Sequence, residues 1–145
     1  MKVAIITTYP PRECGIATFT ENLILSLPKK TEGEKEDTTV LVVAMTDKEG
    51  VYSYPDIVKY SIRENHQNDY LKAADFINYS ADICLLQHEF GIFGGDSGVY
   101  ILPLINRLKV PLLATFHTVL KEPSFSEKAI ISEIGKKAGK IAVMS

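Results

Sequence analysis

Short apolar runs rich in β-branched residues recur along the chain, and stretches with helical periodicity separate them. The runs lie at residues 3–7, 39–44, 82–86, 111–115 and 140–144, with a weaker one at 57–60. The helical stretches lie at residues 16–27, 68–79, 97–108 and 126–138. Continuous apolar strands that lack strict alternation are typical of a parallel sheet covered on both faces. The sequence therefore predicts an α/β fold with a doubly wound, Rossmann-like parallel sheet.

The strand order of such sheets predicts where a ligand binds. Crossovers are almost always right-handed, and the usual order places the first strand between the second and the fourth. We therefore expect the switch point of the sheet between strands 3–7 and 82–86. Ligands bind at the carboxyl ends of the strands beside this point, so the loops after the first, fourth and fifth strands are the candidates. The polar stretches 31–37 and 47–56 are expected to be surface loops.

The composition narrows the class of protein. The 145 residues are the size of one domain, and 46% apolar residues are enough to bury a core without disulfides or a structural metal. A formal net charge of −2 argues against a dedicated nucleic-acid-binding protein. Cys14 and Cys84 do not form the framework of a small secreted domain, so we expect two free thiols in the reducing cytoplasm.

The two ends of the chain carry further expectations. Residues 1–6 are apolar, but Pro10 and Pro11 follow too soon for a membrane span of ~20 residues, so a first strand is predicted. Residues 140–145 end on a strand with no helix after it, which is expected of a segment cut from a longer chain. Lysines gather toward this end at Lys121, Lys128, Lys136, Lys137 and Lys140. A solvated helix face explains them, and peripheral attachment to a membrane is the alternative.

The loop after the first strand, residues 8–17, holds two prolines that stiffen a turn and then a glycine at the start of a helix. Free N–H groups and the positive end of the helix dipole at Gly15 suit a phosphate. Arg12 adds a positive charge that can assist. The dinucleotide fingerprint has three glycines where this loop has one, so the alternative is a glycine needed only for the tight turn.

The loop after the fourth strand, residues 87–98, places polar groups directly after a buried strand and follows them with glycines and two phenylalanines. This pattern predicts a pocket wall, with Asp96 or Ser97 capping the next helix. His88 and Glu89 are the candidate ligand-binding side chains. The alternative is that both hydrogen-bond nearby backbone and only close the loop.

The fifth strand ends in His117, one strand away from the switch point and well placed to meet a ligand. The alternative is a structural histidine with satisfied hydrogen bonds. Residues 95–98 spell the Gly-Asp-Ser-Gly of chymotrypsin-like proteases, but that fold is a pair of β-barrels whose histidine precedes the serine, and His117 follows it here. No known ligand spacing supports a metal site built from His88, Glu89, Asp96 and His117.

Taken together, the three loops resemble the amino-terminal domain of the retaining family-four (group 1) glycosyltransferases of the GT-B fold, which include phosphatidylinositol mannosyltransferases and glycogen synthase relatives. The resemblance covers nearly the whole chain. Residues 114–118, Ala-Thr-Phe-His-Thr, look like the family's strand-then-histidine motif, and residues 87–91, Gln-His-Glu-Phe-Gly, are similar to its loop after the fourth strand. Residues 11–20 resemble the first glycine loop, where the family often has a Gly-Gly pair and this chain has Cys14 and Gly15.

The resemblance implies a role for each loop. In the family the histidine that matches His117 lies against the transferred sugar, which makes His117 the candidate catalytic residue. The glycine loop that matches the amides of Gly15 and Ile16 faces the donor diphosphate, and Arg12 lies beside it in the sequence. The candidate sugar-binding or acceptor-binding residues are His88, Glu89 and Gly94.

The implied reaction is attack by an acceptor hydroxyl on the anomeric carbon of a nucleotide-activated sugar, with retention of configuration, in a cytoplasmic enzyme. Helix amides and cations from two facing domains would meet the leaving-group charge, so no metal or other cofactor is expected. Residues 1–145 would be the acceptor-side domain, without the C-terminal donor-binding domain. The expected partners are the nucleotide-sugar donor, a carbohydrate or lipid-linked acceptor and that missing domain. The segment alone is expected to be inactive.

Two other functions use the same crevice. One is a non-catalytic nucleotide-binding or sugar-binding α/β module, and the other is an epimerase-like enzyme that shares the two-domain plan but rearranges or hydrolyses the donor. A second βαβ domain with paired glutamates in a longer chain would favour the transferase over the binding module. Product analysis with and without an acceptor separates the transferase from the epimerase.

Overall fold

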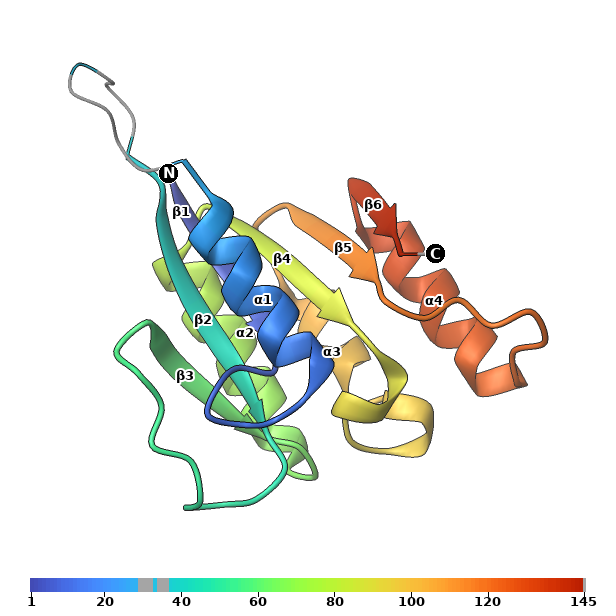
Figure 1. The fold of residues 1–145 in the computed structure, drawn as a ribbon. Helices are drawn as coiled ribbons and strands as arrows, with labels where there is room; N and C mark the ends of the chain where they lie inside the picture. The colour runs from blue at the N-terminus through green and yellow to red at the C-terminus, as the bar shows by residue number, and fades with distance from the viewer. Residues whose placement is uncertain (29–32, 34–36, 145) are drawn as a thin grey trace.

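The computed structural model describes residues 1–28, 33 and 37–144, and a six-stranded sheet lies at its centre (Figure 1). The strands are β1 (Lys2–Thr7), β2 (Thr39–Thr46), β3 (Val58–Arg63), β4 (Ile83–His88), β5 (Leu112–Phe116) and β6 (Lys140–Val143). Every neighbouring pair is parallel, and the order is β3-β2-β1-β4-β5-β6. The predicted α/β parallel sheet is confirmed, and so is its switch point between β1 and β4.

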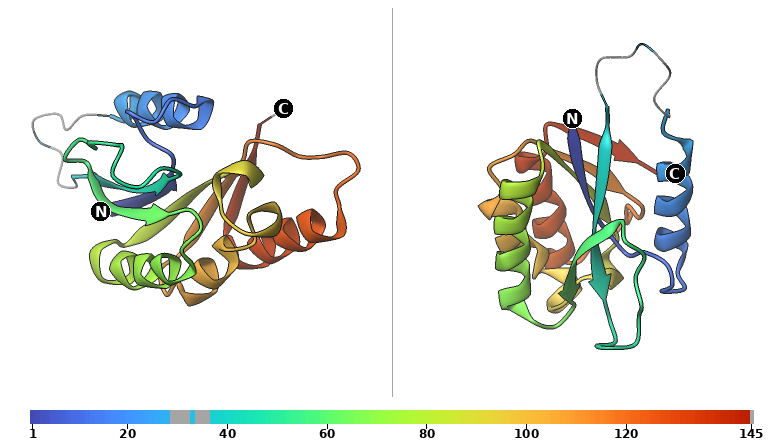
Figure 2. Two further views of the ribbon diagram at one scale, coloured as in Figure 1. Left: turned by 90° about the horizontal axis from the view of Figure 1, so that it is seen from below. Right: turned by 90° about the vertical axis from the view of Figure 1, so that its left-hand side faces the viewer.

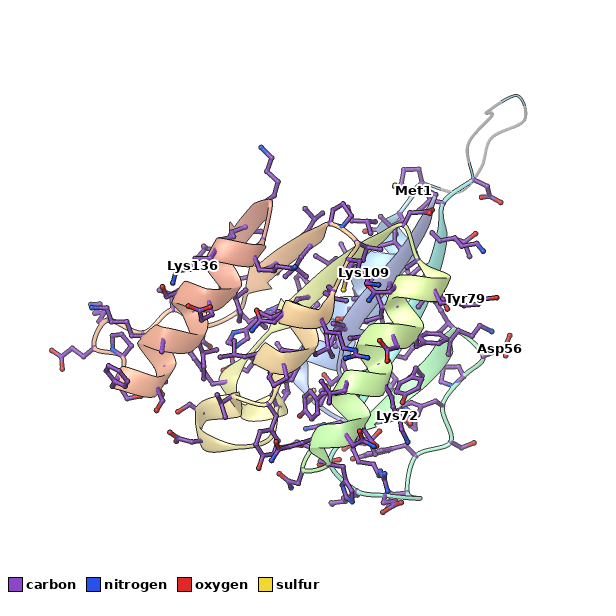
Figure 3. All side chains as sticks on the ribbon, turned by 180° about the vertical axis from the view of Figure 1, so that it is seen from behind. Met1, Asp56, Lys72, Tyr79, Lys109 and Lys136 are labelled. Atoms are coloured by element: carbon purple, nitrogen blue, oxygen red, sulfur yellow. The ribbon has the colours of Figure 1, made fainter. Side chains whose placement is uncertain are left out.

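Helices cover the two faces of the sheet unequally. The α-helices of the described part of the chain are α1 (Gly15–Ser26), α2 (Gln67–Ser80), α3 (Ile101–Arg107) and α4 (Phe125–Lys137). Figure 2 shows α1 alone on one face and the other three on the opposite face. Figure 3 looks onto the three-helix face, where Lys72 and Tyr79 of α2 and Lys136 of α4 point away from the sheet. No helix within the described residues is long and apolar enough to cross a membrane.

Burial on both faces explains why the central strands β1, β2 and β4 are largely apolar. In β1, Ala4 and Ile6 belong to the large core beneath α2, α3 and α4. Ile5 points to the opposite face and is also buried. On that face a smaller cluster of Tyr9, Val42 and Ala44 packs against side chains that include Ile24 of α1. Because neighbouring residues of a strand face opposite sides, each loop at the carboxyl edge delivers side chains to two separate environments.

The predicted helix at 97–108 is wrong at its start, because α3 begins at Ile101. A 3₁₀ turn (Asp96–Gly98) precedes it, with Ser97 at a φ of +54° and Gly98 at +80°. Left-handed backbone of this kind interrupts a right-handed helix. The predicted cap is wrong for the same reason, since an Asp96 carboxylate oxygen instead accepts a hydrogen bond of 2.6 Å from the Ser126 hydroxyl, at the start of α4.

The two predicted surface loops have different outcomes. Residues 47–56 form no helix or strand, and most of them are exposed, as predicted. The predicted loop at 31–37 lies outside the described residues, apart from residues 33 and 37.

Candidate ligand site at the switch point

Gly15 is the first residue of α1, at the carboxyl end of β1 beside the switch point. Its φ lies outside the left-handed region, and nothing lies within 4 Å of the position that a Cβ would occupy. Neither backbone conformation nor packing therefore requires a glycine here. The alternative of a glycine needed for the turn does not account for this position, and the N-terminus of α1 is open to a ligand.

The N-terminus of α1 lacks the cap that protein side chains usually provide. Cys14 stands at the N-cap and makes no side-chain hydrogen bond to the helix, and the first turn contains no acidic residue. The Cys14 thiol instead lies 2.9 Å from the Thr8 hydroxyl. By contrast, α4 has a complete capping box between Ser124 and Glu127. Because first-turn amides have no acceptor inside their own helix, those of α1 are left to water or an anion.

His117 lies directly after β5, and its ring is held by two neighbours. Its Nε2 is 2.6 Å from Oε1 of Gln87, and its ring packs edge-on against Phe19 with centroids 4.8 Å apart. Phe19 is four positions after Gly15, about one helical turn further along α1. The imidazole and the open helix end are therefore neighbours on the face of the sheet that α1 covers.

The environment of His117 favours its neutral form. Burial lowers the pKa of His117 below its ordinary value of 6.5, and the charge of Glu89 opposes this shift. With Oε1 of Gln87 as the acceptor, Nε2 carries the proton and Nδ1 keeps a lone pair. A neutral imidazole in this state can accept a hydrogen bond from a ligand hydroxyl.

Glu89 joins the loops that follow β4 and β5. One carboxylate oxygen accepts a hydrogen bond from the Thr118 hydroxyl, and the other accepts 2.9 Å from the Phe90 amide. The sequence left open whether Glu89 binds a ligand or only closes its loop. These two contacts fix the loop, and they also hold a negative charge close to His117.

The side chain of His88 lies on the opposite face of the sheet from His117. It is fully buried, with Phe90, Phe93 and Phe116 around its ring at centroid distances of 4.9, 5.7 and 5.6 Å. Neither ring nitrogen has a hydrogen-bond partner among the described residues. Burial, with a smaller contribution from the charge of His117, lowers the pKa of His88 to about 4. The structure thus places His88 in an aromatic core, separated from the open edge.

Arg12 is turned toward the ends of β2 and β3. Its guanidinium donates 3.0 Å to the Met45 carbonyl and lies 3.8 Å from the Asp47 carboxylate and 3.9 Å from that of Glu64. Its side chain is only 11% exposed. These contacts oppose its charge and anchor the first loop. A hollow of about 410 Å³ lies beside it, lined by residues that include Cys14 and Tyr52.

Close packing surrounds Gly94. A Cβ added there would lie 2.0 Å from the Glu64 carbonyl oxygen and 2.8 Å from the Tyr100 ring, which itself packs edge-on against Tyr70. The Gly94 amide donates 2.9 Å to the Tyr70 hydroxyl, which in turn donates to the Glu64 carbonyl. This close approach of backbone and rings accounts for a glycine at position 94.

Four of the predicted residues lie around the carboxyl edge of the sheet at the switch point: Gly15, Ile16, Glu89 and His117. The other three, Arg12, His88 and Gly94, make the internal contacts described above. The hydroxyl of Ser97 lies 3.5 Å from an Asp96 carboxylate oxygen, and His117 pairs with Gln87, so the protease-like tetrapeptide forms no triad with His117. Within the described residues, no group of three or more His, Cys, Asp and Glu side chains is placed to hold a metal ion.

Sequence reasoning missed the two residues that position His117, namely Gln87 and Phe19. Gln87 is fully buried, and its Nε2 has no partner in the described part of the chain. Strand alternation was the available signal, since it places residues 87 and 88 on opposite faces once β4 extends to His88. The helical spacing that puts Phe19 on the buried side of α1 was visible, but its contact with His117 depends on tertiary structure.

No protein-family model matches this chain, and no curated protein is significantly similar to it.

Proposed function

We propose that this chain is the acceptor-side half of a retaining glycosyltransferase and that its switch-point edge faces the diphosphate and the sugar of a nucleotide-activated donor. The observation that carries the proposal is the open, uncapped N-terminus of α1, because Phe19, about one helical turn further along α1, packs against the ring of His117. The resemblance of the three edge loops to the family-four enzymes supports the same assignment.

The amides of Gly15 and Ile16 are the groups that would meet the donor diphosphate. They are uncapped donors at the positive end of a twelve-residue helix, where an anion is stabilised by both hydrogen bonds and the helix dipole. Arg12 lines the hollow beside Cys14 and would add a positive charge near this contact, although the carboxylates of Asp47 and Glu64 oppose that charge. The negative charge that develops on the leaving diphosphate is the charge that such preorganised donors stabilise best.

His117 would contact the transferred sugar. Its neutral ring, oriented by Gln87 and Phe19, presents the Nδ1 lone pair to a sugar hydroxyl. In this proposal the nucleotide sugar is a co-substrate, no metal or cofactor takes part, and a facing donor-binding domain holds the nucleotide. A cytoplasmic enzyme with a carbohydrate or lipid-linked acceptor belongs to the same proposal.

Donor binding by isotope-labelled protein tests the phosphate contact. We expect a panel of sugar nucleotides to shift the backbone amide resonances of Gly15 and Ile16 and the ring resonances of His117. Gly15→Val fills the open space at the helix end, so it should weaken binding at least tenfold without unfolding the chain, because no atom lies within 4 Å of its Cβ.

Gly91→Val is the matched control. Gly91 is exposed in the neighbouring loop, and an added Cβ there also meets nothing within 4 Å. Binding should survive this substitution. Equal affinities of Gly15→Val and the wild type for every sugar nucleotide that binds would contradict the assignment of the α1 amides.

A further inference from the structure

Gln87 is the next-to-last residue of β4, and its side chain lies on the face of the sheet that α1 covers. Leu86 before it belongs to the core on the opposite face, so strand alternation places Gln87 beneath α1. The residue is fully buried, and its Oε1 lies 2.6 Å from Nε2 of His117. Its own Nε2 has no hydrogen-bond partner among the described residues. Gln87 therefore pairs with His117 and leaves its amino group unsatisfied.

Packing alone does not account for an amide at position 87. A buried donor without a partner costs free energy that an apolar side chain of similar size would not cost. Methionine is close to glutamine in size, and Met45 shows that a fully buried methionine fits elsewhere in this sheet. A buried polar group with an unsatisfied atom at the edge of a candidate site points to a role in that site.

The side-chain oxygen of Gln87 decides where His117 carries its proton. A neutral imidazole has one N–H, and Oε1 can only accept, so the proton belongs on Nε2. Burial lowers the pKa of His117, and the charge of Glu89 partly offsets this effect. His88 on the opposite face adds no charge at neutral pH, because burial lowers its pKa to about 4. An uncharged amide against Nε2 leaves this balance in favour of the neutral ring.

We propose that Gln87 is a positioning residue that fixes the proton of His117 on Nε2 and keeps the ring neutral, at a cost to the stability of the fold. The Nδ1 lone pair is then the part of the ring that remains for a ligand. That this ligand is a sugar hydroxyl rests on the proposed function, whereas the position of the proton rests on the two side chains alone.

NMR of the 145-residue chain with isotope-labelled histidine tests the inference without any ligand. At neutral pH the wild-type His117 ring should carry its proton on Nε2. Gln87→Met removes both the acceptor and the unsatisfied donor, so both tautomers should be populated and the two ring-nitrogen resonances should move toward each other. Its urea midpoint should equal or exceed that of the wild type. A proton that stays on Nε2 in Gln87→Met, or a clearly lower midpoint, would overturn the inference.

Gln87→Glu places a negative charge where the neutral amide oxygen was. A carboxylate against Nε2 stabilises the imidazolium, so the pKa of His117 should rise above its ordinary value of 6.5. A pH titration of the labelled ring measures this change. A pKa that stays below 6.5 in the folded variant would show that the uncharged amide is not what keeps His117 neutral.

Two control variants separate the proton from the packing. Phe19→Leu removes the edge-on ring contact with His117 but keeps the amide, so the proton should stay on Nε2. Gln67→Met makes the same substitution at an exposed glutamine, the first residue of α2, and should leave the ring and the urea midpoint unchanged. Loss of the Nε2 proton in Phe19→Leu would assign its position to packing and contradict the inference.

Sugar-nucleotide titrations distinguish this inference from the proposed function. In Gln87→Met the amides of Gly15 and Ile16 should still shift, while affinity falls by up to about tenfold because one hydrogen bond to the ligand is weakened. Unchanged affinity would break the link between the proton and the ligand. If the tautomer behaves as expected but no sugar nucleotide shifts the His117 ring, the inference holds and the proposed function is wrong. If sugar nucleotides shift Gly15 and His117 but the free ring carries its proton on Nδ1, the inference alone is wrong.

Discussion

Gly15 and Gly94 are both glycines of edge loops, and their surroundings give them different roles. An added Cβ at Gly94 would collide with the Glu64 carbonyl oxygen, whereas one at Gly15 would meet open space. The sequence grouped both as candidate binding residues, because a glycine in a loop reveals neither its backbone angles nor its neighbours. Of these two glycines, Gly15 has an uncapped amide at an open helix end, whereas the Gly94 amide donates to the Tyr70 hydroxyl.

The buried ring of His88 makes stability depend on pH. Its pKa of about 4 in the folded state lies below the ordinary value of 6.5, so the unfolded chain binds a proton first on acidification. Stability is therefore full above pH 6.5 and falls as the pH drops toward 4, by about 3 kcal/mol from this group. We expect His88→Leu to remove this part of the acid dependence, as measured by urea unfolding between pH 7.5 and 4.

His66→Leu is the control for that experiment, because His66 is exposed at the N-terminus of α2. The free energy of unfolding of His66→Leu should fall between pH 7.5 and 4 by as much as that of the wild type. If His88→Leu and His66→Leu lose stability equally between pH 6.5 and 4, the account of His88 as a neutral core side chain is wrong.

At the scale of the element, the N-termini of α1 and α4 differ in how their first-turn amides are satisfied. Side chains cap α4, whereas no side chain caps α1. The Ser124 hydroxyl accepts a hydrogen bond of 3.2 Å from the Glu127 amide, and Glu127 accepts 2.7 Å from the Ser124 amide. Removing such a cap typically costs about 1 kcal/mol. We expect Ser124→Ala to lower the free energy of unfolding by about this amount in urea titrations.

Ser132→Ala provides the comparison within the same helix. Ser132 is exposed in the middle of α4, where alanine has the higher helix propensity. Its free energy of unfolding should stay the same or rise slightly. A loss at Ser132 as large as that at Ser124 would show that the capping box contributes nothing specific.

The elements that the sequence predicted best are those with strong local patterns. Apolar runs located the central strands because both faces of the sheet are buried there, and the strand order placed Gly15 and His117 at the carboxyl edge. The start of α3 was wrong, because left-handed backbone at Ser97 is unusual for a non-glycine residue. The internal role of His88 was also missed, since a histidine at a strand end does not show which face it occupies.

At the scale of the whole molecule, the candidate site lies at one edge of the sheet, where the first, fourth and fifth strands end. The face of the sheet that α1 covers presents the open end of α1 and the His117 ring at this edge. In the proposed reaction a second domain faces this edge and supplies the remaining charge stabilisation.

Sugar transfer by a longer chain that carries a donor-binding domain tests the central claim most directly. A panel of sugar nucleotides is supplied with an acceptor, and the anomeric configuration of the product is determined by NMR. We predict transfer with retained configuration, a loss of about 100-fold or more in both His117→Ala and Gly15→Val, and no turnover by residues 1–145 alone. Turnover by the 145-residue segment, or wild-type rates in both variants, would contradict the account.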